Sequence, residues 1–298
     1  MGKTLHIHLH SPLRENAEAG QINIFNRIAA ALPGWRLVYR PDTEAERLMA
    51  LARGGYTLFH MQEPPHPRIL CLRRAYHYPF WRIEATNERW RFDVAQAAFD
   101  PADVPHQEAL AFLRRWRPKV FRDGPVTREG FAFVPLQGRL RDHRSFQSMS
   151  PLAMIEATLD HWPGPVRATL HPKEVYDAAD RAALGAIAAR HPRFAVVQAD
   201  ARDLLAACDL VVTQNSSVAL TGFFAAKPAV LFAGIDFHHI AGSVPRDGLE
   251  AAFARALGPE PAYAAYLCWF FKAQAINGGA PEAEAQIVAR LRRHGWPV

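Results

Sequence analysis

The chain has 298 residues, of which 49% are hydrophobic and 21% charged, so it is long and apolar enough to fold into one large or two ordinary globular domains. The longest apolar runs are far shorter than the ~20 residues that cross a bilayer, and the composition excludes a disordered polypeptide. The formal net charge of +6 favours anionic partners, but no nucleic-acid-binding signature accompanies the basic residues, so we expect no nucleic acid partner.

The first part of the chain alternates short predicted strands and helices. Residues 4–10 alternate apolar and His residues, which is typical of a strand. Phe25, Ile28 and Leu32 share one face of a predicted helix over residues 20–32, which ends at Pro33-Gly34. A strand over 35–40, a helix over 43–53 and a strand over 56–61 are predicted next. Residues 68–104 are aromatic and irregular, and a helix is predicted over 106–118.

The alternation becomes more regular in the second half of the chain. Residues 119–130 are polar and contain Gly and Pro, so they are predicted to form a linker. The strands predicted after it are 131–137, 165–170, 193–199, 209–214 and 228–234. The predicted helices are 150–162 (capped by Ser150), 174–190, 201–207 and 217–226, with three more helical stretches near 247–256, 261–275 and 281–294.

Strands that alternate with helices indicate an α/β fold with parallel sheets and helices on both faces. We expect two Rossmann-like lobes that face a central cleft. The predicted lobes are residues 1–125 and 126–275, and residues 276–298 are predicted to form a C-terminal helix that packs back on the first lobe. In such sheets, ligands bind outside the carboxyl ends of the strands.

Polar residues follow four of the predicted strands in the second half. A Ser-Ser pair that opens a helix presents backbone N–H groups to an anion. Each feature also has a plainer interpretation, since Asn-Ser-Ser is a common helix cap and His-Pro a common turn. Their agreement on one sheet edge favours a binding site. The candidates are His171, Pro172, Asn215, Ser216, Ser217, Gln137, Asp142, Arg144 and Gly234.

The first predicted strand carries His6, His8 and His10 on one face. Side chains that share a strand face are ~7 Å apart, too far for all three to reach one ion, so we expect no metal site. His10 lies at the carboxyl end of the strand, and Arg14 and Glu15 follow it in a polar segment that is predicted to be a loop. We interpret these three residues as candidates for contact with an acceptor.

Several other classes of protein are disfavoured. The sequence has no G-x-G-x-x-G and no P-loop motif, which argues against NAD enzymes and P-loop NTPases. Cys71, Cys208 and Cys268 are too widely separated to predict a disulfide framework, and no signal peptide is visible, so we expect a cytoplasmic protein. Residues 262–274 form an amphipathic stretch that suits either a membrane surface or, more in keeping with its spacing, core packing.

Three segments resemble bacterial capsule polysaccharide biosynthesis proteins: FVPLQ-(x)4-D-x-x-S at 133–145, LHP at 170–172, and TQNSSVALTGFFAAKPAVLFAG at 213–234. That family comprises glycosyltransferases of the two-Rossmann (GT-B) class and includes transferases of Kdo, a 3-deoxy acidic sugar, from CMP-Kdo. The His-Pro and Ser-Ser pairs also resemble motifs of bacterial sialyltransferases. The resemblance covers roughly residues 130–275.

The resemblance implies that the second lobe binds a nucleotide sugar and the first lobe an acceptor. His171 would contact the CMP moiety, and Ser216 and Ser217 would hold its phosphate. Asp142 and Gln137 would lie at the reaction centre, where a carboxylate acts as a base or a nucleophile.

The function expected from these features is transfer of an acidic sugar from a CMP-linked donor to a capsule or other surface glycan. The alternatives are another donor, such as a UDP- or GDP-sugar or CDP-glycerol, a non-catalytic glycan-binding or assembly protein, and a GT-B-like hydrolase or epimerase that acts on the same nucleotide sugars. We expect no cofactor besides the donor, a glycan or glycolipid acceptor, and peripheral contact with the inner membrane or a capsule assembly complex.

Overall fold

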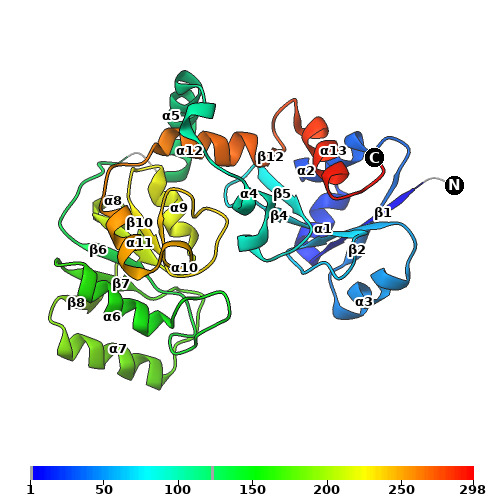
Figure 1. Cartoon of the computed structure of the whole chain (residues 1–298). Coiled ribbons are helices and arrows are strands. Elements are labelled where there is room, and N and C mark those ends of the chain that lie inside the picture. Colours follow the sequence, from blue (N-terminus) through cyan, green and yellow to red (C-terminus); the bar gives the residue numbers. More distant parts are fainter. Residues whose placement is uncertain (1–2, 122–123) are drawn as a thin grey trace. The chain divides into compact units, whose positions relative to one another are not determined.

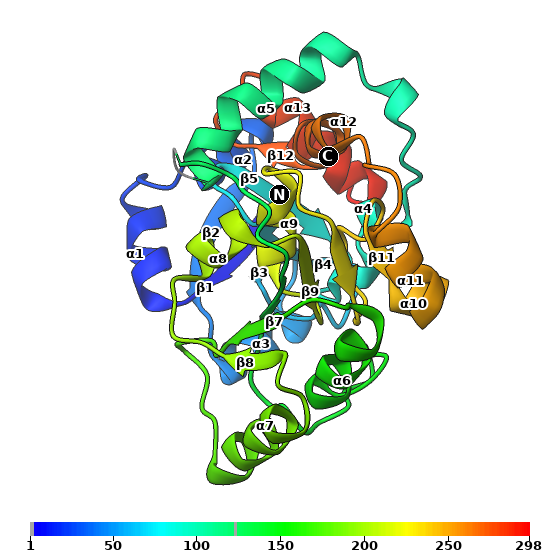
Figure 2. The same cartoon turned by 90° about the vertical axis from the view of Figure 1, so that its left-hand side faces the viewer.

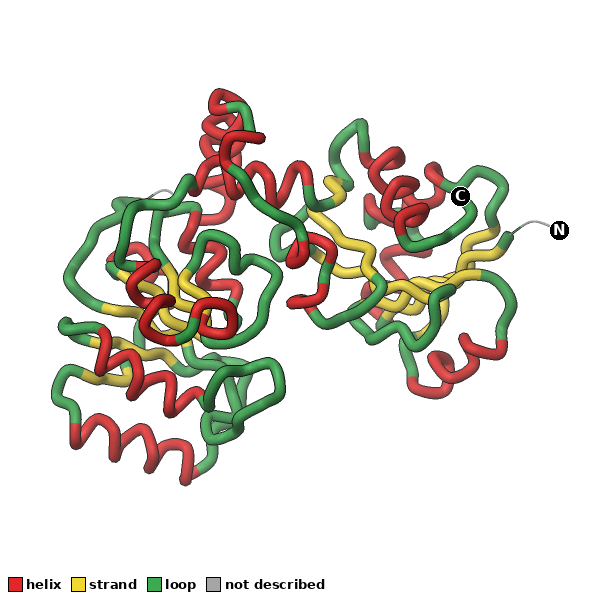
Figure 3. Tube along the Cα trace, in the orientation of Figure 1, coloured by secondary structure: helices red, strands yellow, loops and turns green. Residues whose placement is uncertain are grey.

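The computed structural model describes residues 3–121 and 124–298. The chain divides into two compact units (Figure 1). Unit 1 comprises Met1–Ala97 and Trp269–Val298, and unit 2 comprises Ala98–Cys268. Each unit contains its own six-stranded sheet, with helices packed against it (Figure 3). The predicted α/β class with two Rossmann-like lobes is confirmed, and the predicted cleft stays a prediction.

The sheet of unit 1 has the strand order β12-β5-β4-β3-β1-β2. The pairs among β2, β1, β3 and β4 are parallel, whereas β5 is antiparallel to both β4 and β12. Its strands are β1 (Thr4–Leu9), β2 (Arg36–Pro41), β3 (Tyr56–His60), β4 (Ile69–Arg74), β5 (Phe80–Glu84) and β12 (Ile276–Asn277). Its helices are α1 (Ser11–Glu18), α2 (Asn23–Ala31), α3 (Glu44–Ala52), α4 (Asp93–Gln96) and α13 (Ala283–Arg293), with a 3₁₀ helix η1 (Arg89–Arg91) and a π-helix η3 (Trp269–Ala273).

The alternation of β1 sends its side chains to two different environments. Leu5, Ile7 and Leu9 are fully buried in the main core of unit 1, together with residues of α1, α2 and α13. His6 and His8 lie on the other face of the sheet, which α3 covers (Figure 1). The core beneath α3 is small and contains Ala50, Phe59 and Ile69. The two faces of this sheet are therefore unequally covered.

The sheet of unit 2 has the strand order β11-β10-β9-β6-β7-β8, and all of its strand pairs are parallel. Its strands are β6 (Ala132–Pro135), β7 (Val166–Thr169), β8 (Phe194–Val196), β9 (Leu210–Thr213), β10 (Ala229–Leu231) and β11 (Gly242–Ser243). Its helices are α5 (His106–Phe121), α6 (Pro151–His161), α7 (Ala178–Arg190), α8 (Ala201–Ala207), α9 (Ser217–Phe223), α10 (Val244–Asp247), α11 (Leu249–Ala256) and α12 (Tyr263–Cys268), with a short turn η2 (Pro101–Asp103).

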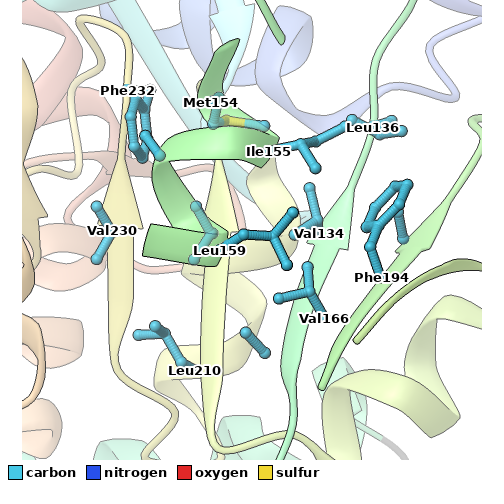
Figure 4. Packing of buried hydrophobic residues seen from close by; sticks show 14 of the residues in the cluster. Val134, Leu136, Met154, Ile155, Leu159, Val166, Phe194, Leu210, Val230 and Phe232 are labelled. Carbon is cyan, nitrogen blue, oxygen red and sulfur yellow. The ribbon is translucent and has the colours of Figure 1, made fainter. Parts of the chain in front are cut away.

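Helix α6 covers the centre of this sheet and begins where the sequence predicted. The Ser150 hydroxyl group accepts a hydrogen bond from the N–H of Ala153 at 3.2 Å, which satisfies one free donor of the first turn. Ile155 and Leu159 of α6 pack on Val134 of β6 and its neighbours (Figure 4). Burial of each such side chain contributes about 1.5–3 kcal/mol, so α6 is held firmly over the central strands.

Three local predictions were wrong. The segment that contains Arg14 and Glu15 is helix α1 rather than a loop, with Pro12 in its first turn and Ala17 buried. The irregular region 68–104 contains the strands β4 and β5. The linker predicted at 119–130 begins inside α5, which runs to Phe121. Residues 122 and 123 of that linker lie outside the described residues.

The division into units differs from the predicted lobes, because contacts separate the chain after Ala97 and after Cys268 rather than near residues 125 and 275. Helix α5 runs alongside α12 (Figure 2), which makes both helices part of unit 2. Helix α13 packs against α2 within unit 1. Tyr263 and Tyr266 of α12 are buried, as is Phe270 in η3, so the amphipathic stretch 262–274 is core and not a free apolar surface.

Candidate functional site

The central strands of unit 2 form a topological switch point. The chain runs from β6 to β7 and β8 on one side, and then returns to β9 on the other side of β6. In open α/β sheets the crevice outside the carboxyl ends at such a point is where ligands bind. Gln137 follows β6 here, and the segment 214–217 follows β9. The candidate site is thus built at the position that the fold itself favours.

The segment after β9 is held rigidly against β6. The Thr213 hydroxyl group donates to the carbonyl oxygen of Pro135 at 3.4 Å, and the Gln214 amide donates to that of Met149 at 3.1 Å. The Ser216 hydroxyl group caps α9 by accepting from the N–H of Val218 at 3.3 Å. Asn215 is buried and Ser217 is exposed. Of the predicted donor-binding residues here, Ser217 therefore has the most accessible hydroxyl group.

His171 lies at the carboxyl end of β7, on the opposite side of β6 from Ser217. Its Nδ1 accepts a hydrogen bond from the N–H of Lys173 at 3.2 Å, so the neutral ring carries its proton on the exposed Nε2. Its own N–H donates to the Tyr176 hydroxyl group at 2.9 Å. Neighbouring strands lie ~4.8 Å apart, so the ends of β7 and β9 are separated by about 10 Å. That span suits a nucleotide.

The loop after β6 carries Asp142 and lies against the side chain of Glu174. A Cβ at Gly138 would lie 2.3 Å from the Glu174 Oε2, so any larger residue there would displace the Glu174 side chain from the loop. Asp142 is exposed and forms an ion pair with Arg139, whose Nε lies 2.9 Å from Oδ2. The Gln137 Oε1 atom is buried and has no hydrogen-bond partner among the described residues. Gln137 Oε1 is thus an unsatisfied acceptor that a ligand reaches only when the atoms covering it move.

Arg144 is the guanidinium associated with these carboxylates. Burial lowers its pKa, the charge of Arg139 lowers it further, and Asp142 and Glu174 act in the opposite direction. Its Nε has no hydrogen-bond partner among the described residues. An arginine in this condition can offset the negative charge of a phosphate or a sugar carboxylate.

The loop that carries Arg144 continues across the ends of β9 and β10. The N–H of Gly234 donates to the carbonyl oxygen of Phe146 at 2.8 Å, and that of Ser148 donates to Phe232 at 2.8 Å. The N–H of Gly234 is therefore engaged within the protein. Any role of Gly234 in donor binding would depend on its small size instead.

The carboxyl edge of unit 1 also coincides with a switch point, because β2 and β3 lie on opposite sides of β1. The ring of His10, after β1, lies 5.8 Å from the ring of His60 at the end of β3. Burial, followed by the nearby His10, lowers the pKa of His60 to about 4. The sequence analysis missed His60, although its position at a strand end was a signal.

Arg14 and Glu15, the other acceptor-side candidates, lie on α1. Arg14 forms an ion pair with Glu18 at 3.7 Å, and Glu15 accepts a hydrogen bond from the Ser11 hydroxyl group at 2.5 Å. Both interactions are local to the helix, so the helical conformation, and not a loop, decides where these side chains point.

The three histidines of the first strand do not converge on one point. His6 Nδ1 lies 3.5 Å from the Nε of Arg40, and His8 packs edge-on against Phe59 with ring centroids 5.0 Å apart. His10 instead pairs with His60. Packing and polar cover account for the first two residues.

Glu174 and Tyr176 were also missed by the sequence analysis. Both follow His171 closely in the chain, and the turn after Pro172 folds them back toward the ends of β6 and β7. Only the conformation of this turn shows that Glu174 lies against Gly138, more than thirty residues earlier in the chain.

No family model matches the chain. No curated protein matches it either.

Solved structures of similar topology exist at low sequence identity. The β-Kdo 2,7-transferase KpsC of Thermosulfurimonas dismutans aligns with a TM-score of 0.48 and 15% identity, over 89% of this chain and 89% of that chain. The β-Kdo 2,4-transferase KpsC of the same organism aligns with a TM-score of 0.45 and 14% identity, over 87% and 88%. The wall teichoic acid polymerase TagF aligns with a TM-score of 0.31 and 10% identity, over 98% and 89%. At these levels the similarities assign no activity to the chain.

Proposed function

We propose that this chain is a glycosyltransferase that transfers a sugar from a nucleotide-linked donor to a glycan acceptor. The observation that carries the proposal is the coincidence of Gln137, Ser217 and His171 with the ends of three adjacent strands at the switch point of unit 2. These residues also lie in the segments that resemble capsule polysaccharide biosynthesis proteins.

The donor proposed is CMP-linked, with an acidic sugar of the Kdo or sialic acid type. His171 Nε2 and the Ser217 hydroxyl group offer hydrogen-bond donors beyond the ends of β7 and β9, two strands that lie about 10 Å apart, which suits the two ends of a nucleoside monophosphate. Arg144 supplies positive charge for the phosphate or the sugar carboxylate. Fixed donors of this kind stabilise a leaving phosphate through preorganised electrostatics.

The catalytic group proposed is a carboxylate beside Arg144, either in the loop after β6 or in the turn after β7. Asp142 is the first choice, and Glu174 is the second, because both lie near Arg144. Either carboxylate can accept the proton of an acceptor hydroxyl group as the glycosidic bond forms, or attack the anomeric carbon directly. Gln137 would orient the sugar through its unpartnered oxygen.

The acceptor proposed is a surface glycan or glycolipid, recognised by the carboxyl edge of unit 1 that carries His10, Arg14 and Glu15. The proposed localisation is the cytoplasm, in peripheral contact with the inner face of the membrane or with a capsule assembly complex. Among the described residues, no helix is both long and apolar enough to cross a bilayer, so the membrane contact proposed is at the surface.

The test of the catalytic proposal is the release of CMP from CMP-Kdo by the purified chain, with and without a capsular glycan acceptor. The variants are Asp142→Asn and Glu174→Gln, with Asp160→Asn on the remote helix α6 as the matched control. Loss of the true catalytic carboxylate lowers the rate by about 10²–10⁴-fold, whereas the control retains it. Acceptor-dependent turnover that survives both substitutions would refute the assignment.

A further inference from the structure

Helix α3 of unit 1 exposes an apolar face to solvent, which a helix that only packs on a sheet does not require. Leu48 is 64% exposed and Met49 52% exposed, and Ala45 and Ala52 on the same face are exposed too. These positions follow the i, i+3, i+4, i+7 spacing of one helical stripe. An amphipathic helix of a globular protein normally turns such a stripe toward the core.

Glu46 and Arg47 of α3 are already paired away from this stripe, and the remaining charged residue, Glu44, is exposed beside it. Arg47 forms an ion pair with Asp42 at 2.7 Å, and Glu46 pairs with Arg53 at 2.6 Å. Only Ala50 of this helix is buried. The apolar stripe of α3 therefore faces outward, where it can contact an apolar phase.

A basic pocket of about 560 Å³ adjoins the C-terminal end of α3. It lies at the amino ends of β1, β2 and β3, on the edge of the sheet opposite to the acceptor-side candidates. Arg53, the residue that ends α3, is part of its wall. The lining contains four basic side chains and no carboxylate, and consists of Lys3, Thr4, His6, Arg36, Arg40, Arg53, Gly54, Gly55 and Tyr56.

The pocket has a floor of backbone atoms, and basic side chains of β2 lie on one face of the sheet beside it. Gly55 has φ +94°, and a Cβ there would lie 2.6 Å from the carbonyl oxygen of Thr4, so the floor can only be backbone. Arg36 and Arg40 are four residues apart on the edge strand β2, so their side chains lie on the same face, and the Nε of Arg40 lies 3.5 Å from His6 Nδ1. Burial lowers the pKa of His6, and the charges of Arg40 and Arg53 lower it further, so the ring stays neutral beside them.

We propose that α3 and this basic pocket form a docking surface for an anionic phospholipid bilayer. Leu48 and Met49 enter the boundary of the acyl chains, while Arg36 and Arg40 contact the phosphate of a headgroup. An apolar helical stripe next to basic side chains is the chemistry that interfacial helices use to bind anionic membranes. Charge complementarity selects this occupant over a second copy of the chain, whose matching surface would be equally basic.

The inference gives a surface to the membrane contact of the proposed function, and it does not depend on the donor site. It can be tested on the full chain without nucleotide or acceptor, so a failure here and a failure of the glycosyltransferase proposal are distinguishable.

The experiment is cosedimentation of the purified chain with vesicles of phosphatidylcholine alone or with 30% phosphatidylglycerol. Two double variants remove the two halves of the surface: Leu48→Gln with Met49→Gln, and Arg36→Gln with Arg40→Gln. Matched controls alter exposed residues of unit 2: Val175→Gln with Leu257→Gln, and Arg114→Gln with Arg181→Gln.

The expected result is binding to the anionic vesicles that falls by about tenfold or more in either surface variant and stays unchanged in both controls. Binding should also weaken steeply in 0.5 M salt, because screening shortens the reach of the arginine charges. Equal binding by wild type and both surface variants would overturn the proposal. Binding of inorganic phosphate at 10 mM without binding to the anionic vesicles, or self-association that requires Leu48 and Met49, would overturn it in favour of a soluble anion or a second copy.

Discussion

The hydroxyl group of Tyr176 accepts a hydrogen bond from the backbone N–H of His171 at 2.9 Å and lies 3.5 Å from the carbonyl oxygen of Leu136. One side chain thereby ties the end of β7 to the end of β6. Burial raises the pKa of Tyr176, which keeps the phenol neutral. The orientation of His171 thus depends on a residue that does not need to touch a ligand.

We expect Tyr176→Phe to weaken CMP binding several-fold, with a loss of only about 1 kcal/mol in the free energy of unfolding. The binding loss arises because His171 is no longer held, and it is measured by titration calorimetry beside a urea unfolding curve. Tyr78→Phe, which alters an exposed tyrosine of unit 1, is the control. Unchanged CMP affinity in Tyr176→Phe would show that the turn holds His171 without the hydroxyl group.

Lys227 is a buried structural cation of unit 2. It is 1% exposed, and its Nζ donates hydrogen bonds to the carbonyl oxygens of Cys208, at 2.6 Å, and Thr127. Lys227→Met keeps the packing but leaves both carbonyl groups without this donor, so we expect a loss of about 2–3 kcal/mol in the free energy of unfolding. Urea unfolding measures it, with the exposed Lys173→Met as the control. Equal midpoints for the two variants would contradict this role.

His8 is expected to lower the stability of unit 1 as the pH falls. Burial lowers its pKa to about 4, and neither ring nitrogen has a hydrogen-bond partner among the described residues. Because the unfolded state takes up a proton near pH 6.5 and the folded state does not, stability is lost as the pH falls from about 6.5 toward 4.

We expect His8 to account for up to about 2 kcal/mol of the unfolding free energy that the wild type loses between pH 7 and pH 5. In His8→Leu this part of the loss should be absent. The measurement is the free energy of unfolding in urea at both pH values, with the exposed His66→Leu as the control. The same pH dependence in His8→Leu and the wild type would rule out His8 as a source.

Glu84 sits in a charged cluster of unit 1. It is 1% exposed, and its Oε2 accepts from the N–H of Asp93 at 2.9 Å. Asp93 in turn pairs with Arg290 at 3.1 Å and Arg293 at 2.9 Å. Donor atoms of Glu84, Asp93 and His294 lie within 4.8 Å of one another, but these two arginines already neutralise Asp93, which makes the cluster a structural network rather than a cation site.

Burial raises the pKa of Glu84 to about 7, although the charge of Arg82 lowers it. The folded state therefore keeps a proton that the unfolded state releases near pH 4.5, and the resulting stability is lost as the pH rises toward 7. We expect the stability of Glu84→Gln relative to the wild type to increase by up to about 3 kcal/mol between pH 4.5 and pH 8. Glu88→Gln is the control, and a pH-independent difference for Glu84→Gln would disprove the shift.

The sequence predicted the strand and helix rhythm best where apolar residues alternate without interruption. The predicted helix over 201–207 coincides with α8, and the Ser150 cap was correct. The strand β5 was not predicted because its segment includes Arg82, and an arginine normally indicates an exposed position. Arg82 is 2% exposed because its guanidinium lies 4.5 Å from the ring of Phe270 and donates to the carbonyl oxygen of Gln274 at 2.7 Å. Such distant partners cannot be read from local sequence.

In the candidate site, only the residues that closely follow a strand could be placed from the sequence. His171 and Ser216 follow strands directly, so the parallel order alone places them at one edge of the sheet. Glu174 reaches this site through a turn, and His60 reaches the edge of unit 1 through the pairing of β1 with β3. The turn conformation and the strand pairing both depend on tertiary contacts, which periodicity does not encode.

The most direct test of the account is calorimetric titration of the chain with CMP, UDP and GDP, using the wild type, His171→Ala and His191→Ala. His191-Pro192 is the second His-Pro pair of unit 2, at the end of α7, and serves as the matched control. The account predicts selective CMP binding that falls at least tenfold in His171→Ala and is unchanged in His191→Ala. No nucleotide binding by the wild type, or equal binding of UDP and GDP, would contradict it.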